Sequence, residues 1–246
     1  MKDTLRSYGL ITDNYNGKKV LIIGGIIYLI INFFTIFFFK LYFGTENIWE
    51  KYYFLLIISN GIGIVDDISG NKKIKGFRGH LKSLSKGKLT TGLLKALIIF
   101  FAALLVNFNY PFLEMVLNTA LIIFMSNFIN LVDLRPGRAF KIYFILFIPA
   151  IFYLQWQVIF IIQTIIFLLM ASGELNEKIM LGDGGANSLG ASLGFFYSIN
   201  FGNYFKLLLL FIIMIFNFLA EFYSFTEIIK KNKILNYIDQ LGRKKL

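Results

Sequence analysis

The chain has 246 residues, of which 57% are hydrophobic and 16% charged, and its net charge is +11. Soluble domains carry about 25% charged residues, so this composition, with apolar residues in long blocks, excludes a soluble core and indicates an integral membrane protein. Because the chain has no cysteine, it has neither a disulfide nor a thiolate metal site. The polar start, residues 1–19, lacks an apolar segment, so we expect no cleavable signal peptide.

Eight apolar runs predict one domain, residues 1–246, that folds as an all-α bundle of about eight transmembrane helices. Some runs are shorter than the ~20 residues that a straight span needs, so their helices must extend into flanking polar residues. Gln155 and Gln157 flank Trp156, and this triplet predicts a turn at the membrane interface between two spans. The runs are 20–39, 52–65, 91–107, 112–131, 140–155, 157–172, 187–204 and 206–225.

The distribution of charge predicts the orientation. Eight spans place both termini on one side, together with all but three of the 25 Lys and Arg residues, the exceptions being Lys40, Lys51 and Lys206. The positive-inside rule then puts both termini and the long loops in the cytoplasm of a multi-pass plasma-membrane protein. Basic residues beside a bilayer meet anionic lipid headgroups, so we expect no nucleic acid partner. Every Asp falls on the same side, a bias that a cytoplasmic active site would explain.

Two adjacent carboxylates, Asp66 and Asp67, end the second run and precede a basic loop. Adjacent carboxylates repel each other unless a cation lies beside them. Mg²⁺ takes oxygen ligands and usually shares them with substrate phosphates, so this stretch indicates a phosphate site. The alternative is a capped membrane helix followed by a solvated basic face. The loop also holds the only histidine, His80, and its cations are Lys72, Lys73, Lys75, Arg78, Lys82, Lys86 and Lys88.

A second polar group ends the fourth run, where Asn127, Asn130 and Asp133 follow one another at three-residue spacing. This spacing places them on one helical face, and polar groups at the end of a membrane helix are candidates for a functional site. The alternative is interhelical hydrogen bonding. Arg135 and Arg138 follow in a rigid turn, and arginine suits phosphate, although both could simply anchor the loop.

A third group, Leu181-Gly-Asp183-Gly-Gly, precedes the seventh run. Glycines allow backbone N–H groups to approach a phosphate at a helix start, and Asp183 could instead cap the helix. Ala186, Gly190 and Gly194 form a small-residue packing face. All three groups lie at the same end of their spans, so Asp66, Asp67, Asp133 and Asp183 are expected to converge on one pocket.

In order along the chain, these motifs resemble the polyprenyl-phosphate N-acetylhexosamine-1-phosphate transferases. The matched stretches are Gly24-Gly25, Gly63-Ile-Val-Asp66-Asp67 with Lys82 and Lys88 downstream, Asn127-x-x-Asn130-x-x-Asp133 and Leu181-Gly182-Asp183-Gly-Gly. Together they cover almost the whole chain. The chain departs from the family in continuing Asp133 with Leu-Arg instead of Asp-Gly, and in lacking the late histidine cluster.

The resemblance implies that the chain transfers a sugar-1-phosphate from a UDP-sugar to undecaprenyl phosphate and releases UMP, in bacterial envelope synthesis. It implies Mg²⁺, with Mn²⁺ as an alternative, held by Asp183. Asp66 and Asp67 then assist the lipid phosphate. The expected substrate-binding residues are Asn127, Asn130, Asp133, Lys75, Lys82, Arg135 and Arg138.

Two other classes stay open, a transporter and a scaffold that binds lipid phosphate without turnover. Intramembrane carboxylates mark ion pathways, but here they gather at one edge. The missing histidine cluster keeps the scaffold open, and the chain could act as a monomer or a homodimer.

Overall fold

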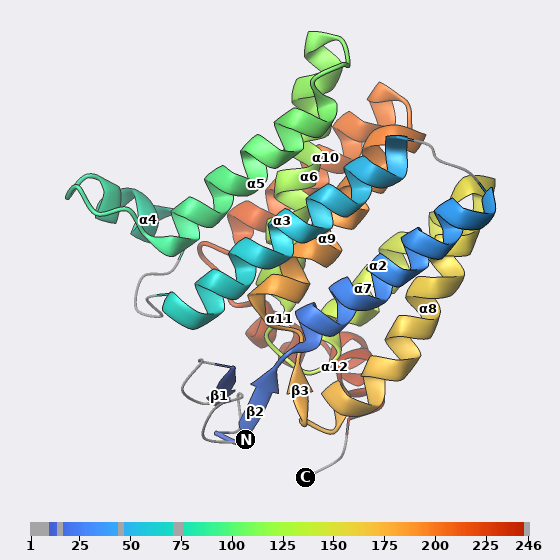
Figure 1. Ribbon diagram of the computed structural model, residues 1–246. Helices are drawn as coiled ribbons and strands as arrows, with labels where there is room; N and C mark the ends of the chain where they lie inside the picture. The colour runs from blue at the N-terminus through green and yellow to red at the C-terminus, as the bar shows by residue number, and fades with distance from the viewer. Residues whose placement is uncertain (1–9, 14–16, 44–46, 71–75, 244–246) are drawn as a thin grey trace.

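The computed structural model describes residues 10–13, 17–43, 47–70 and 76–243, which form a helical bundle with a small sheet at one end (Figure 1). The all-α prediction is confirmed for the bundle. Its helices are α2 (Gly24–Phe43), α3 (Asn47–Ser69), α4 (Gly76–Leu84), α5 (Thr91–Asn107), α6 (Phe112–Val132), α7 (Arg138–Phe147), the 3₁₀ helix η1 (Ile148–Phe152), α8 (Leu154–Leu175), α9 (Gly182–Asn200), α10 (Asn203–Leu219), α11 (Phe225–Lys231) and α12 (Lys233–Gln240).

Three helices in the described part of the chain are long and apolar enough to cross a membrane, those over residues 24–42, 47–69 and 112–132. Three shorter apolar helices cover residues 91–107, 161–175 and 203–219. Large apolar side chains on the outside of α2 are about half exposed, among them Phe34 (52%) and Phe38 (52%). Such a surface is costly in water and suits a hydrocarbon surrounding.

Helix α9 is the centre of the bundle, because residues 184–198 are all buried. Gly190 and Gly194 let it approach α6 closely. A Cβ on Gly190 would lie 2.5 Å from Ser126 Cα, and one on Gly194 would lie 2.5 Å from Ile122 Cα. The predicted small-residue packing face is thereby confirmed.

This close approach predicts opposite effects for two glycine substitutions. Gly190→Ala forces α6 and α9 apart and should lower the free energy of unfolding by about 1–3 kcal/mol. The matched control is Gly61→Ala, on an exposed face of α3 with no atom within 4 Å of the added Cβ. It should raise stability by about 0.5–1 kcal/mol. Unfolding in detergent checks both, and equal effects would contradict the packing.

The sheet is the part of the fold that the apolar runs do not predict. Strands β1 (Ile11–Asp13), β2 (Lys19–Ile22) and β3 (Ile179–Met180) lie in that order, with β1 antiparallel and β3 parallel to β2. The β2–β3 pairing aligns Leu21 with Ile179 and Ile22 with Met180. It therefore fixes the starts of α2 and α9 side by side.

Three predicted boundaries shift. The turn expected at Gln155–Gln157 is wrong in position, because α7 gives way to η1 at Ile148 and α8 already begins at Leu154. Pro149 explains the break, since proline lacks the N–H that continues an α-helix. Helix α3 extends to Ser69, so Asp66 and Asp67 lie in its last turn. Helix α9 begins at Gly182 instead of residue 187, which brings Asp183 into its first turn.

Candidate functional site

Asp66, Asp67 and Asp183 meet where α3 ends and α9 begins, the region called here the aspartate end. Lys95, in the first turns of α5, bridges two of them. Its Nζ lies 2.8 Å from Asp66 Oδ2 and 2.5 Å from Asp183 Oδ2. The Lys95 side chain is 11% exposed and those of Asp66 and Asp183 are 15% and 35% exposed. One ammonium thus joins carboxylates that are far apart in the sequence.

Asp67 caps α9 from the neighbouring helix. Its Oδ1 accepts a hydrogen bond from the backbone N of Asp183 at 3.1 Å, and its Oδ2 accepts one from the backbone N of Gly184 at 3.3 Å. These N–H groups have no partner within their own helix, and a carboxylate there also interacts favourably with the helix dipole. The helix-capping role considered for Asp183 therefore belongs to Asp67.

Glycines bring the backbones of α2, α3 and α9 into contact at the aspartate end. A Cβ on Gly63 would lie 2.5 Å from Gly184 Cα, and one on Gly25 would lie 2.5 Å from Gly185 N. Asn60 adds a hydrogen bond from its Nδ2 to the carbonyl of Gly25 at 2.7 Å. The glycine motifs therefore serve close packing of α2, α3 and α9, and this packing sets the position of the carboxylates.

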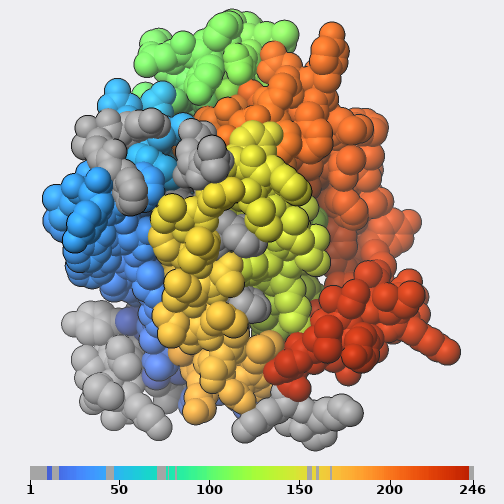
Figure 2. All heavy atoms as spheres, turned by 90° about the vertical axis from the view of Figure 1, so that its right-hand side faces the viewer, coloured from blue at the N-terminus to red at the C-terminus, as the bar shows by residue number. Residues whose placement is uncertain are grey.

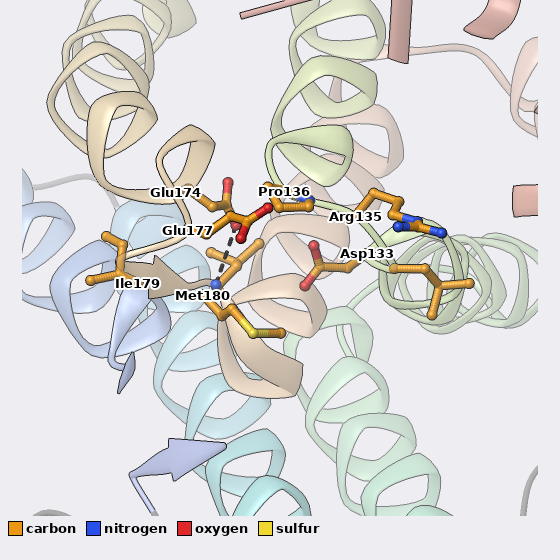
Figure 3. A pocket seen from close by; sticks show the side chains of 9 residues that line it. Asp133, Arg135, Pro136, Glu174, Glu177, Ile179 and Met180 are labelled. Carbon is orange, nitrogen blue, oxygen red and sulfur yellow. Dashed lines mark hydrogen bonds between the residues drawn. The ribbon is translucent and has the colours of Figure 1, made fainter. Parts of the chain in front are cut away.

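Asp133 lies in an adjoining pocket with a cavity of about 30 Å³, room for water but not for a nucleotide. Figure 3 shows Asp133 and Arg135 on one side and Glu174 and Glu177 on the other. Glu174 accepts hydrogen bonds from the backbone N of Leu181 at 3.3 Å and of Gly137 at 3.1 Å. Burial raises the pKa of Asp133 well above its usual range, and the charges of Glu174, Asp183 and Asp67 raise it further.

The charge balance of the aspartate end suits a cation. Three carboxylates face one ammonium, which leaves excess negative charge in a partly buried place. Their oxygen atoms are the ligands that Mg²⁺ prefers, so Asp66 and Asp183 fit as holders of such an ion. As arranged here, no three His, Cys, Asp or Glu side chains within the described ranges lie close enough to hold a metal. A bound ion would compete with Lys95 for the same oxygens.

Two predicted substrate-binding residues lie on α6. Asn127 is exposed and its Nδ2 donates a hydrogen bond to Asn217 Oδ1 on α10 at 2.6 Å. This hydrogen bond is the interhelical contact considered as the alternative role of Asn127, and binding of substrate by Asn127 stays a prediction. Asn130 is half-buried, and its carbonyl accepts a bond from the Asp133 backbone N at 3.3 Å. Asp133 itself follows the last residue of α6.

The two arginines have different surroundings. Arg135 lines the Asp133 pocket. Arg138 is 3% exposed and forms a bidentate ion pair with Asp239 of α12, at 2.7 Å from Nε and 3.0 Å from Nη2. Arg243 binds the same carboxylate at 2.8 and 3.0 Å. Arg138 would have to leave this pair to contact a substrate, so its substrate role stays a prediction.

The buried ion pair predicts a clear loss of stability on removal of its carboxylate. Burial acts to raise the pKa of Asp239, but the bonds from Arg138 and Arg243 outweigh it and hold the pKa below its usual value. Asp239→Asn should cost on the order of 3 kcal/mol at pH 7, because two guanidiniums lose their partner. Because the folded pKa is lowered, this stabilisation is complete above about pH 4 and lost as the pH falls further.

Denaturation of the Asp239→Asn variant at pH 7 and at pH 3 checks this prediction. The control is Glu227→Gln, in an exposed ion pair with Lys230 at 3.3 Å, where the effect should stay below about 1 kcal/mol. Equal effects at the two positions would contradict the assignment.

Helix α4 carries part of the predicted basic loop. Lys82 is exposed on it, while Lys75 lies outside the described residues. His80 Nδ1 lies 2.7 Å from Thr90 Oγ1, and this hydroxyl accepts a bond from the Leu93 backbone N at the start of α5. His80 therefore contacts the cap of α5, a structural role. Arg78 stacks on Phe222, with 4.7 Å from Cζ to the ring centroid, so α4 also contacts the segment after α10.

Sequence reasoning missed Lys95 and Glu174 as site residues. Lys95 falls four residues into an apolar run, outside the basic loop that the sequence singles out. A lysine inside such a run is costly unless it has a partner, and that cost was the available signal. Glu174 offers a similar signal, because it is a carboxylate directly after a long apolar stretch.

Comparison of the chain with protein-family models, with curated proteins and with solved structures found no match.

Proposed function

We propose that this protein is a membrane enzyme that transfers a sugar-1-phosphate from a UDP-sugar to undecaprenyl phosphate and releases UMP. The aspartate end would face the cytoplasm of a bacterial cell, with the bundle crossing the plasma membrane. One observation carries the proposal: Asp66, Asp67 and Asp183, which the sequence motifs single out, meet around Lys95 at one end of the bundle. The resemblance of four ordered motifs supplies the substrate class.

In the proposed reaction, an oxygen of the lipid phosphate attacks the phosphorus that carries the sugar. The new P–O bond forms as the bond to the bridging oxygen of the diphosphate breaks, and UMP leaves with that oxygen. Such transfers depend on positioning and on charge neutralisation more than on covalent catalysis by the protein. When bound, Mg²⁺ would neutralise the diphosphate.

The residues of this chain have separate tasks in the proposal. Asp183 and Asp66 would hold the cation, and Lys95 would keep them together before it binds. Asp67 is already engaged by the start of α9, so it positions Asp183. Asp66 would in addition align the lipid phosphate. Exposed cations of α4, such as Lys82, would meet the incoming phosphates.

Exchange of labelled UMP into a UDP-sugar tests the proposal in membranes that contain the protein. The forward reaction forms the lipid-linked product, and its reversal with labelled UMP places the label in the UDP-sugar. Exchange should therefore require both Mg²⁺ and undecaprenyl phosphate. Absence of exchange with every UDP-sugar in a broad panel would overturn the proposal.

One observation favours a second candidate, a scaffold that binds lipid phosphate without turnover. Lys95 already pairs with both Asp66 and Asp183, and a protein that never binds a metal would keep this arrangement. The scaffold would bind UDP-sugar or lipid phosphate and release no UMP over hours. A cation flux in liposomes without any UDP-sugar would instead indicate a transporter.

A further inference from the structure

Helix α12 has an apolar face that points away from the bundle. Ile234, Tyr237, Ile238 and Leu241 are 71%, 68%, 40% and 47% exposed. Their spacing, i, i+3, i+4 and i+7, places the first three in one stripe on the helix, and Leu241, the C-cap residue, follows at its end. Asp239 lies on the opposite side, where it is 9% exposed and bound to Arg138. The helix is therefore fixed to the bundle by its polar side.

The surroundings of this stripe indicate what covers it. Figure 2 shows the segment of α11 and α12 (red) projecting from the side of the bundle, below α10 (orange). Helix α10 carries its own exposed apolar side chains, including Phe211 at 64% and Phe218 at 64%. Phe222 and Tyr223, 48% and 60% exposed, continue this surface towards α11. The chain thus leads from an apolar outer surface on α10, through Phe222 and Tyr223, to the apolar stripe of α12.

Positive charge accompanies the stripe. Lys231 and Lys233 are exposed at the junction of α11 and α12, and Lys230 is exposed one residue earlier. An apolar stripe beside a row of lysines is the pattern of a helix that lies in the plane of a membrane surface. Lysines near such a surface contribute about 1 kcal/mol each through anionic headgroups. Tyrosine, here Tyr237, also favours the headgroup level.

We infer that α12 lies flat on an anionic lipid surface, with Ile234, Tyr237, Ile238 and Leu241 in the headgroup region. This inference rests on the membrane placement made under the proposed function, but not on the reaction. The ion pairs of Asp239 then connect the lipid contact to the turn after Asp133, since Arg138 and Arg243 both bind this carboxylate and Arg243 also donates to the carbonyl of Pro136 at 2.9 Å.

Spin labels test the inference in the full chain, which has no native cysteine. Tyr237→Cys and Leu241→Cys each receive a nitroxide, in nanodiscs that contain phosphatidylglycerol. The control is Gln240→Cys, exposed on the polar flank of the same helix, where Gln240 donates to Asn236 Oδ1 at 2.9 Å. Phe211→Cys on α10 reports on membrane placement. Collision rates with oxygen, which enriches in lipid, and with a water-soluble nickel complex measure the depth of each label.

The oxygen-to-nickel ratio at positions 237 and 241 should be several-fold higher than at position 240, with a depth of about 5–10 Å. The ratio should fall in nanodiscs of phosphatidylcholine alone. Water-like ratios at 237 and 241 with a lipid-like ratio at 211 would overturn the inference while leaving the membrane placement intact. Dipolar broadening between labels of two copies would assign the stripe to a homodimer and likewise overturn it. A ratio unchanged in phosphatidylcholine would overturn the role of anionic lipid.

Discussion

Asp183→Asn is expected to reduce the rate of UMP release by about 10²–10³-fold or more, the cost of losing one preorganised electrostatic group. The substitution keeps the shape of the side chain but removes the charge that would hold a cation. Of the two carboxylates that Lys95 contacts, Asp66 then remains as its charged partner. UMP release by purified protein measures the effect. Binding of UDP-sugar should change much less than the rate.

Two further variants make the Asp183 prediction specific. Asp183→Glu retains the charge and should keep more activity than Asp183→Asn. Glu227→Gln removes an exposed carboxylate in α11 and should leave the rate unchanged. Wild-type rates in Asp183→Asn, with the protein folded, would show that this carboxylate is not part of the reacting site.

Lys95→Met is the second prediction with a large effect, because it leaves two close carboxylates without their cation. At pH 7 the free energy of unfolding should fall by about 3 kcal/mol, the range for breaking a buried ion pair. UMP release should also fall, but the variant should reach its half-maximal rate at a lower Mg²⁺ concentration, because the ion no longer competes with Lys95 for the oxygens of Asp66 and Asp183. Denaturation and a magnesium titration of the rate measure these effects separately.

A double variant separates charge repulsion from lost packing at Lys95. Asp66→Asn in the Lys95→Met background removes one of the repelling charges and should recover part of the stability. Lys88→Met, at an exposed lysine before α5, is the matched control and should change stability by less than about 0.5 kcal/mol. A double variant less stable than Lys95→Met would contradict the bridging role.

The sequence predicts most of the aspartate end because of where its carboxylates lie. Asp66, Asp67 and Asp183 each stand at the edge of an apolar run, and helices expected to span the same membrane would bring their ends to the same two levels. Side chains from distant segments therefore share one level, and close packing at glycines such as Gly63 and Gly184 brings two of these segments into contact.

The remaining contacts depend on details that a hydropathy pattern does not contain. Which carboxylates Lys95 contacts depends on how α5 is rotated about its own axis relative to α3 and α9. A run of apolar residues does not reveal this rotation. The sheet is short, with only two residues in β3, so its pairing depends on neighbouring helices more than on strand propensity. Asn127 turns to α10 because Asn217 lies there as a partner, which three-residue spacing alone does not reveal.

The proposed function depends above all on the chemistry of the aspartate end. The most direct test is incubation of the purified protein with undecaprenyl phosphate, Mg²⁺ and a panel of UDP-sugars, followed by measurement of UMP and of the lipid product. We predict that one UDP-sugar yields equal amounts of UMP and of lipid-linked sugar diphosphate, and that chelation of Mg²⁺ stops both. UDP-sugar that binds and is never cleaved, with every sugar in the panel, would contradict the account.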